Sequence, residues 1–390
     1  MATAMNCARD AAGCFAAGLL TVAPHHPVSR PVSKPKMKLL VLAQPPPPVH
    51  GQSLMVRTLV AGLPAHGVEV QHVNLALSRD AADIGRWHPG KIRAVLDACC
   101  HAVWLRFTAG CDTLYYIPAP GKRGALYRDW VVMLLCRPFF SKLVLHWHAA
   151  GLGEWLATRA TAPERRLTRR LLGRADLSLV LSESLRGDAA ALGPRSIVIV
   201  PNGIADPSSD APAVRPGDSF QVLFLGLCCE EKGLFAAAEA VLAAGSGFSF
   251  VAAGAFPDAT TQKRFGALCA KHPAALRYAG PVHGAEKSKL FRESSCLCLP
   301  THYPAEGQPL VLLEAMAHDL PVIATRWRGI PDTLPPEAGL VEPGDNSALT
   351  HTLVHLRNHP TAAGVFRRHY LAHFTAEQHL AALAAALRTL

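Results

Sequence analysis

Tyr303-Pro-Ala-Glu-Gly-Gln-Pro-Leu-Val-Leu-Leu-Glu-Ala-Met-Ala-His-Asp-Leu-Pro321 is the stretch that decides the fold. Apolar runs of strand length flank it, at 295–300 before it and at 321–325 after it. Pro309 suits the first position of a helix, since its missing N–H would have no partner there, and the Leu- and Ala-rich run that follows favours helix. The stretch therefore predicts a unit of strand, loop, helix and strand.

The chemistry of this unit follows from the helix that it contains. In open parallel sheets the loop after a strand lies where ligands bind, and the next helix points its free N–H groups and positive dipole end there. Glu306 on the loop and Glu314 in the second helical turn flank this anion site. Two carboxylates would repel a phosphate, so hydroxyl groups are their expected partners. A sugar nucleotide fits this combination, and a surface helix with two solvated carboxylates is the alternative.

The spacing Glu, seven residues, Glu within EGQPLVLLEAMAHDLPVIAT resembles the signature of family 4 retaining glycosyltransferases. The resemblance covers roughly residues 37–390 and implies the GT-B fold, an α/β arrangement of two Rossmann-like parallel-sheet domains facing across a cleft. It implies that Glu306 lies near the donor sugar and that Glu314 holds the ribose hydroxyls. It also implies that diphosphate and sugar contact the backbone of the positions between them, which are Gly307, Gln308, Pro309 and Leu310.

Length, charge and cysteine content limit the alternatives. A chain of 390 residues, half of them apolar, suggests two domains with sizeable cores. The net charge of +10 is compatible with nucleic acid, an anionic membrane or anionic substrates, but no nucleic-acid module accompanies it. The eleven cysteines include no Cys-x-x-Cys pair and are expected to be reduced thiols of a cytoplasmic protein. No zinc spacing and no Asp-x-Asp pair occur, so we expect neither a metal nor a cofactor.

Two segments of the amino-terminal half carry further candidate site residues. A Pro-rich loop over 44–53 follows the first expected strand, and its Gly51 and Gln52 match the loop that lies near donor phosphates and acceptor in the family. A simple strand-to-helix connection is the alternative. His146 and His148 end the strand over 142–148, and the resemblance assigns a contact with donor sugar or acceptor to His148 first. A histidine satisfied within the core is the alternative for either ring.

The carboxyl-terminal half adds a basic candidate and a nucleobase loop. Lys232 occupies the family position whose charge meets the donor diphosphate, although an ordinary helix-start residue is the alternative. Leu227 stands where an Arg is common, so half of the usual cationic clamp is missing. The segment 279–284, which includes Val282, resembles the loop whose backbone frames the nucleobase. The catalytic candidates are therefore Glu306, His148 and Lys232.

Composition shifts suggest how the chain is divided. We expect a disordered extension, with a secretory signal as the weaker alternative, then two Rossmann-like domains joined by a linker, and a last helix that crosses back to the first domain. The boundaries are 1–36 for the extension, 37–205 for the acceptor-side domain, 206–218 for the linker, 219–375 for the nucleotide-sugar domain and 376–390 for the last helix. The Arg-rich amphipathic segment 163–174 suggests a peripheral position at the inner face of a membrane, with a solvated surface helix as the alternative.

The resulting hypothesis is a retaining, metal-independent hexosyl- or related glycosyltransferase. It moves a sugar from a nucleoside-diphosphate sugar to a hydroxyl of a glycan or lipid-linked acceptor, in cell-envelope or exopolysaccharide synthesis. A sugar-nucleotide epimerase of the same fold and a catalytically silent sugar-nucleotide-binding protein are the alternatives, and Leu227 favours the second. A nucleic-acid binder is suggested by charge alone.

Overall fold

The computed structural model describes residues 37–76, 89–207 and 219–390. The strands of these residues form two six-stranded sheets. Every strand pairing within each sheet is parallel. The predicted α/β fold of two parallel-sheet domains is confirmed. The expected extension 1–36 and most of the expected linker 206–218 lie outside the described residues.

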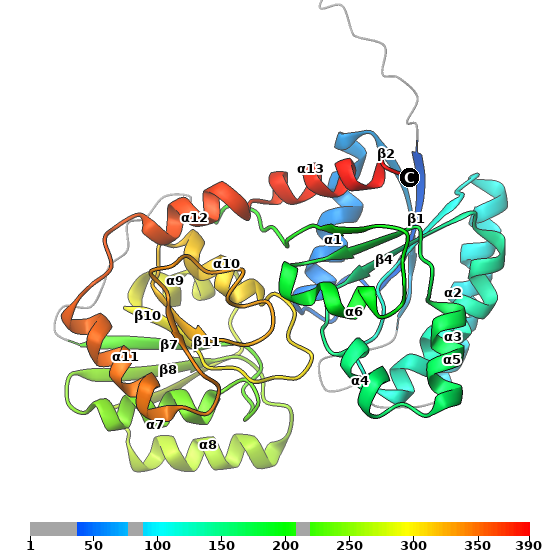
Figure 1. The fold of residues 1–390 in the computed structure, drawn as a ribbon. Coiled ribbons are helices and arrows are strands. Elements are labelled where there is room, and N and C mark those ends of the chain that lie inside the picture. Colours follow the sequence, from blue (N-terminus) through cyan, green and yellow to red (C-terminus); the bar gives the residue numbers. More distant parts are fainter. Residues whose placement is uncertain (1–36, 77–88, 208–218) are drawn as a thin grey trace, which may run out of the picture. The chain divides into compact units, whose positions relative to one another are not determined.

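The first sheet has the strand order β2-β1-β3-β4-β5-β6, and its strands β1, β2 and β4 are labelled in Figure 1. Its strands are β1 (Met37–Ala43), β2 (Val68–Asn74), β3 (Thr113–Tyr116), β4 (Lys142–Trp147), β5 (Leu177–Val180) and β6 (Ile197–Ile199). The helices between them are α1 (Gly51–Gly62), α2 (Pro89–Thr108), α3 (Arg123–Cys136), α4 (Leu152–Thr158), α5 (Ala162–Leu171) and α6 (Arg186–Ala190), with short 3-10 helices η1 (Leu63–His66), η3 (Arg137–Phe139) and η4 (Glu183–Leu185).

Strand β1 shows why these strands are continuous apolar runs. Leu40 and Leu42 belong to one buried cluster, which they share with residues of α2 and α3. Leu39 and Val41 belong to another, which they share with residues of α1. A strand that is covered on both faces needs apolar side chains at every position rather than at alternate ones.

The second sheet has the order β12-β11-β10-β7-β8-β9. Its strands are β7 (Phe220–Leu225), β8 (Phe248–Ala253), β9 (Leu276–Gly280), β10 (Cys296–Leu299), β11 (Val322–Thr325) and β12 (Gly339–Val341). The helices of this half are α7 (Leu234–Ala244), α8 (Ala259–Lys271), α9 (Gly284–Glu293), α10 (Leu310–Ala317), α11 (Asn346–Asn358), α12 (Val365–His373) and α13 (Ala376–Leu387). The predicted central unit is therefore β10, α10 and β11. Pro309 precedes α10 as its N-cap, with extended backbone, rather than occupying its first helical position.

The last helix returns to the first sheet. Leu383 and Leu387 of α13 lie in the same buried cluster as Leu39 of β1 and Leu59 of α1, and Figure 1 shows α13 beside α1. The hydroxyl of Thr375 caps α13 at its start, in a capping box with Gln378. The two halves of the chain are thus tied together by a helix that follows the second sheet in sequence but packs on the first.

The helices of the described residues include none that is both long and apolar enough to span a bilayer.

Candidate functional site

Glu306 lies on the loop between β10 and α10, where it is buried and charge-paired. Only 5% of the residue is exposed. Its Oε2 accepts hydrogen bonds from Lys232 Nζ at 2.6 Å and from Thr301 Oγ1 at 3.0 Å. Lys232 comes from the loop after β7, and its Nζ lies 4.9 Å from the centre of the Tyr303 ring. Two of the three predicted catalytic residues therefore form one ion pair, and a hydrogen bond from Thr301 holds the same carboxylate.

The start of α10 presents donors without protein acceptors. In the part of the chain that the structure describes, the N–H groups of Leu310 and Val311 have no backbone acceptor. Such groups, together with the aligned peptide dipoles, favour an anion at a helix start. Gly51, at the start of α1, lies beside them, because a Cβ built on it would be 3.6 Å from Leu310 Cγ. The predicted substrate-binding residues of both halves therefore meet at this point.

The neighbouring Gly307 and Gln308 connect the two halves directly. A Cβ on Gly307 would lie 2.3 Å from the carbonyl oxygen of His148, so only glycine allows this approach. The Gln308 side chain accepts from the backbone N–H of Asn202 at 2.7 Å and donates to Thr333 Oγ1 at 3.2 Å. Asn202 Nδ2 also donates to the carbonyl oxygen of Gln308 at 3.3 Å, so only the backbone N–H of Gln308 remains for a ligand.

His148 follows β4 and is one of three neighbouring histidines. Its ring centre is 4.2 Å from that of His146, which in turn lies 6.4 Å from the ring of His379 on α13. Burial lowers the pKa of His148 to about 3 and that of His379 to about 4, and it also lowers the pKa of His146. All three rings are therefore neutral near pH 7.

The two strand-end histidines differ in their burial and in the contact that Tyr115 makes with one of them. Tyr115 Oη is hydrogen-bonded to Nδ1 of His146, which is fully buried. Nε2 of neither ring has a hydrogen-bond partner among the described residues, but His148 as a residue is only partly buried. This geometry supports His148 rather than His146 as the ring that contacts a ligand.

Glu314 and Val282 lie further along the same edge of the second sheet. Glu314 accepts a hydrogen bond from Lys287 Nζ of α9 at 2.5 Å. Burial raises the pKa of Glu314, and the charge of Lys287 and its hydrogen bond oppose that shift. Val282, just before α9, packs partly buried against the core of the second sheet. Gln52, in the first turn of α1, is half-buried.

Sequence reasoning missed several residues that organise the site. They are Thr301 and Lys287, which hold the two glutamates, Asn202, which holds Gln308 before α10, and His379, which lies near His146. The signal in the sequence is the capping pattern of Thr375 and Gln378, which indicates the start of α13, the helix that contains His379. Leu227, where an Arg was expected, is 39% exposed. The described residues contain no group of three or more His, Cys, Asp or Glu arranged to hold a metal ion.

Comparison with known proteins agrees with this geometry. Residues 219–359 match the family model of group 1 glycosyl transferases. A curated relative, WcaL of Salmonella typhimurium, is named as a colanic acid biosynthesis glycosyltransferase and is 26% identical over 292 residues, which cover 70% of this chain and 68% of WcaL.

Solved structures share the fold across nearly the whole chain. Sucrose-phosphate synthase from Thermosynechococcus elongatus superimposes with a TM-score of 0.72 at 17% identity, covering 91% of this chain and 99% of that one. Anabaena HepE in complex with UDP-glucose gives 0.66 at 15% identity, covering 91% and 100%. The chain therefore has the GT-B fold and is a glycosyltransferase that carries a group 1 glycosyl transferase domain over residues 219–359.

Proposed function

We propose that the protein is a retaining glycosyltransferase that moves a sugar from a nucleoside-diphosphate sugar to a hydroxyl acceptor. The observation that carries this proposal is the ion pair of Glu306 and Lys232 beside the start of α10. A carboxylate, a cation and free backbone N–H groups at one strand end are what a sugar and a diphosphate together require. UDP is the first nucleotide to test, because HepE of the same fold is solved with UDP-glucose.

The roles follow from what each group has free. Lys232 and the N–H groups of Leu310 and Val311 would stabilise the negative charge that develops on the departing diphosphate. Glu314 would accept hydrogen bonds from the ribose hydroxyls, and the nucleobase would lie against the loop that contains Val282. His148, neutral and with Nε2 free, would hydrogen-bond a hydroxyl of the sugar or acceptor.

We infer that the acceptor attacks from the side on which the diphosphate departs. The bond between the anomeric carbon and the phosphate oxygen breaks, the acceptor oxygen bonds to that carbon, and its proton passes to the departing phosphate oxygen. This course retains the anomeric configuration without a covalent enzyme intermediate. The contacts of Glu306 support it, because a carboxylate that already accepts from Lys232 and Thr301 is suited to orienting a sugar hydroxyl rather than to attacking carbon.

The missing Arg at Leu227 is a specific observation in favour of a silent binding protein. Lys232 and Lys287 are the cations held at the two glutamates, and each is already neutralised by one of them. A diphosphate would therefore have to share Lys232 with Glu306. We expect weak donor binding but not its loss, since the N–H groups at the start of α10 add positive potential beside the Glu306–Lys232 pair.

The proposed setting is the synthesis of an envelope glycan or exopolysaccharide on a glycan or lipid-linked acceptor. The named pathway of WcaL supports it. A cytoplasmic location and contact with the inner face of a membrane belong to the same proposal.

The test is nucleoside-diphosphate release from UDP-, GDP- and ADP-sugars, first with water as the acceptor and then with glycan acceptors. The anomeric configuration of the product is read by NMR. Glu306→Gln should lower turnover by about 100-fold without weakening UDP binding, because it releases Lys232 for the phosphates. Glu314→Gln should weaken UDP binding about tenfold. Glu239→Gln, an exposed carboxylate on α7, is the matched control and should change neither.

Three outcomes would refute the proposal in different ways. Unchanged turnover in Glu306→Gln would remove that carboxylate from the mechanism. UDP binding by calorimetry without release from any donor would favour a silent binding protein. A donor whose sugar is converted without release of its nucleotide would favour an epimerase.

A further inference from the structure

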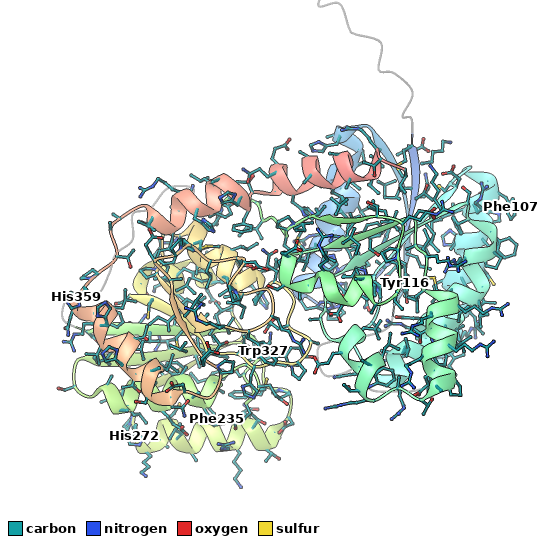
Figure 2. All side chains as sticks on the ribbon, in the orientation of Figure 1. Phe107, Tyr116, Phe235, His272, Trp327 and His359 are labelled. Carbon is teal, nitrogen blue, oxygen red and sulfur yellow. The ribbon has the colours of Figure 1, made fainter. Side chains whose placement is uncertain are left out.

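Helix α2 carries a row of apolar side chains that face solvent. Ile92, Leu96, Trp104 and Phe107 recur at a spacing of three, four or eight residues, which places them on one side of the helix. All four are exposed, Trp104 to 59% and Phe107 to 69%. Figure 2 shows Phe107 on the outer side of α2. The opposite side of the helix, which includes Val95 and Ala102, is buried in the core of the first domain.

Helix α3 and the turn that follows it continue the same surface. Tyr127, Val131, Leu134 and Leu135 are exposed along α3, and Phe139 is exposed on η3. The Phe139 ring lies 6.1 Å from that of Phe107, so the row on α3 and η3 adjoins the row on α2. Together the two rows hold nine of the twelve large hydrophobic residues that are exposed in the described chain. We name these nine residues the α2–α3 face.

Such a concentration needs an explanation. Single exposed apolar residues are normal on a protein surface, but a contiguous group marks a site of interaction. The nine residues contain none of the donor-site candidates, and the fold does not cover them with another described element.

Basic residues border the α2–α3 face. Helix α5 lies beside α3, since Trp130 Nε1 donates to Thr168 Oγ1 at 3.0 Å. On α5 and just after it, four arginines are exposed, namely Arg166, Arg169, Arg170 and Arg174. The acidic residues of α2, α3 and α5 are already paired, Asp97 with Arg93, Asp129 with Arg128 and Glu164 with Arg123. The border of the face is therefore positively charged.

A basic cavity extends this border beyond Phe139. It has a volume of about 260 Å³ and is lined by Phe140 and by the cations Arg137, Lys142, Arg174 and Arg195, with one acidic residue, Asp176. Asp176 is paired with Arg195 at 2.8 Å. Arg137 of η3 reaches the end of α5 through the carbonyl oxygen of Leu171. A phosphate-sized anion at the edge of the face would thus find two further cations that no described carboxylate side chain pairs with, Arg137 and Lys142, of which Lys142 also donates to the carbonyl oxygen of Leu390.

We propose that the α2–α3 face is a docking surface for an anionic lipid bilayer. Aromatic and aliphatic side chains on one side of a helix enter the boundary between headgroups and acyl chains, while neighbouring arginines face the lipid phosphates. A cytosolic protein partner would not require this excess of positive charge around the apolar residues. The proposal does not rest on the identity of the donor, because none of its residues belongs to the donor site.

The experiment is co-flotation of the full chain with vesicles. Phosphatidylcholine vesicles that contain 30–40% phosphatidylglycerol are compared with phosphatidylcholine alone, at low and at high salt. We expect binding to the anionic vesicles, weakened by salt and at least about tenfold stronger than to the neutral ones. Emission of Trp104 should shift to the blue on binding, and Trp104→Phe should remove that shift.

Paired variants separate the apolar and electrostatic contributions. Phe107→Ser with Leu134→Ser should weaken vesicle binding at least about tenfold. Leu371→Ser on α12, which replaces a leucine of 43% exposure away from the face, should not. Substitution of Arg166, Arg169 and Arg170 by Gln should weaken binding to the anionic vesicles, whereas the same change at three exposed basic residues of α8 and β9, namely Lys263, Lys271 and Arg277, should have a much smaller effect.

Two results would overturn the proposal. Equal binding of the wild type and of the Phe107/Leu134 variant to anionic vesicles would show that the apolar residues do not enter the bilayer. A wild-type dimer in light scattering that becomes monomeric in that variant, with no vesicle binding by either, would assign the face to a second copy of this chain. Thermal unfolding serves as the folding control for all variants.

Discussion

Gly307→Ala should disable the site by moving the loop that holds Glu306. The added Cβ would lie 2.3 Å from the carbonyl oxygen of His148, whereas ordinary contact begins at 3.4 Å. The carbonyl oxygen of His148 is a backbone atom and the position of the Cβ is fixed by the backbone, so neither atom can rotate away. The loop must therefore move back by about 1 Å. A displacement of that size in a positioned catalytic group costs about 100-fold in rate.

Gly51→Ala is the matched control for this substitution. A Cβ there meets only Leu310, at an ordinary 3.6 Å, and the backbone of Gly51 does not have positive φ. The fold should therefore tolerate the change. Any loss of turnover without a loss of thermal stability would mean that substrate approaches this backbone, which separates a donor loop from a simple strand-to-helix connection.

The assay for both variants is UDP release from UDP-glucose, or from the best donor of the panel, together with thermal unfolding. Gly307→Ala should lower kcat about 100-fold while the protein remains folded. Full activity in Gly307→Ala would refute the reasoning, because the loop would then have to absorb the displacement without moving Glu306. If unfolding occurs below assay temperature, the residual UDP affinity at a lower temperature still reports the position of the loop.

Three further predictions concern charge and metal. Lys287→Met should raise the pKa of Glu314 further, because burial then acts without the opposing ammonium group. UDP should therefore bind about tenfold more weakly than to the wild type, and more weakly at pH 6 than at pH 8. The control Lys289→Met should show neither effect. The unfolded chain takes up protons on its histidines as the pH falls below 6.5, whereas His148 and His379 stay neutral in the folded protein. The free energy of unfolding in urea should therefore fall by about 1.6 kcal/mol per ring between pH 6.5 and 5, and substitution of both residues by Gln should reduce that fall. EDTA should leave turnover unchanged. Loss of turnover in EDTA, with recovery on adding Mg²⁺, would contradict metal independence.

The fold could be predicted because its determinants are local. A strand that is buried on both faces must be a continuous apolar run, as at 39–42. Gly and Pro residues at the end of such a run indicate that a loop begins there. The start of α10 was predictable to within one residue, and Pro309 shows the limit, since an N-cap and a first helical position differ only in ψ.

The pairing of the site residues could not be predicted, because it depends on distance in space. Lys287 and Glu314 are 27 residues apart, and Asn202 and Gln308 are 106 apart. No pattern in the sequence shows which cation meets which carboxylate. The same limit hid the α2–α3 face, because the apolar residues of α2 have the periodicity of a helix in either a core or an interface. Only packing distinguishes Trp104, which is exposed, from Val95, which is buried.

The contact between Gly51 and Leu310 implies a movement when donor binds. These residues flank the free N–H groups of α10, and a Cβ on Gly51 would already touch Leu310 at 3.6 Å. We predict that a diphosphate that reaches those N–H groups separates the two loops, as in the gating motions of enzymes that exclude water from their reaction.

A reversible crosslink tests this movement. In Gly51→Cys with Leu310→Cys, the new Cβ at position 51 would lie near the side chain at position 310, as a disulfide requires, so oxidation should hold the loops together. UDP binding should then be lost and should return with dithiothreitol, while oxidised wild type, whose described cysteines are mostly buried, keeps its affinity. Undiminished UDP binding by the oxidised variant would mean that the phosphates reach the protein elsewhere, and α10 would lose its assigned role.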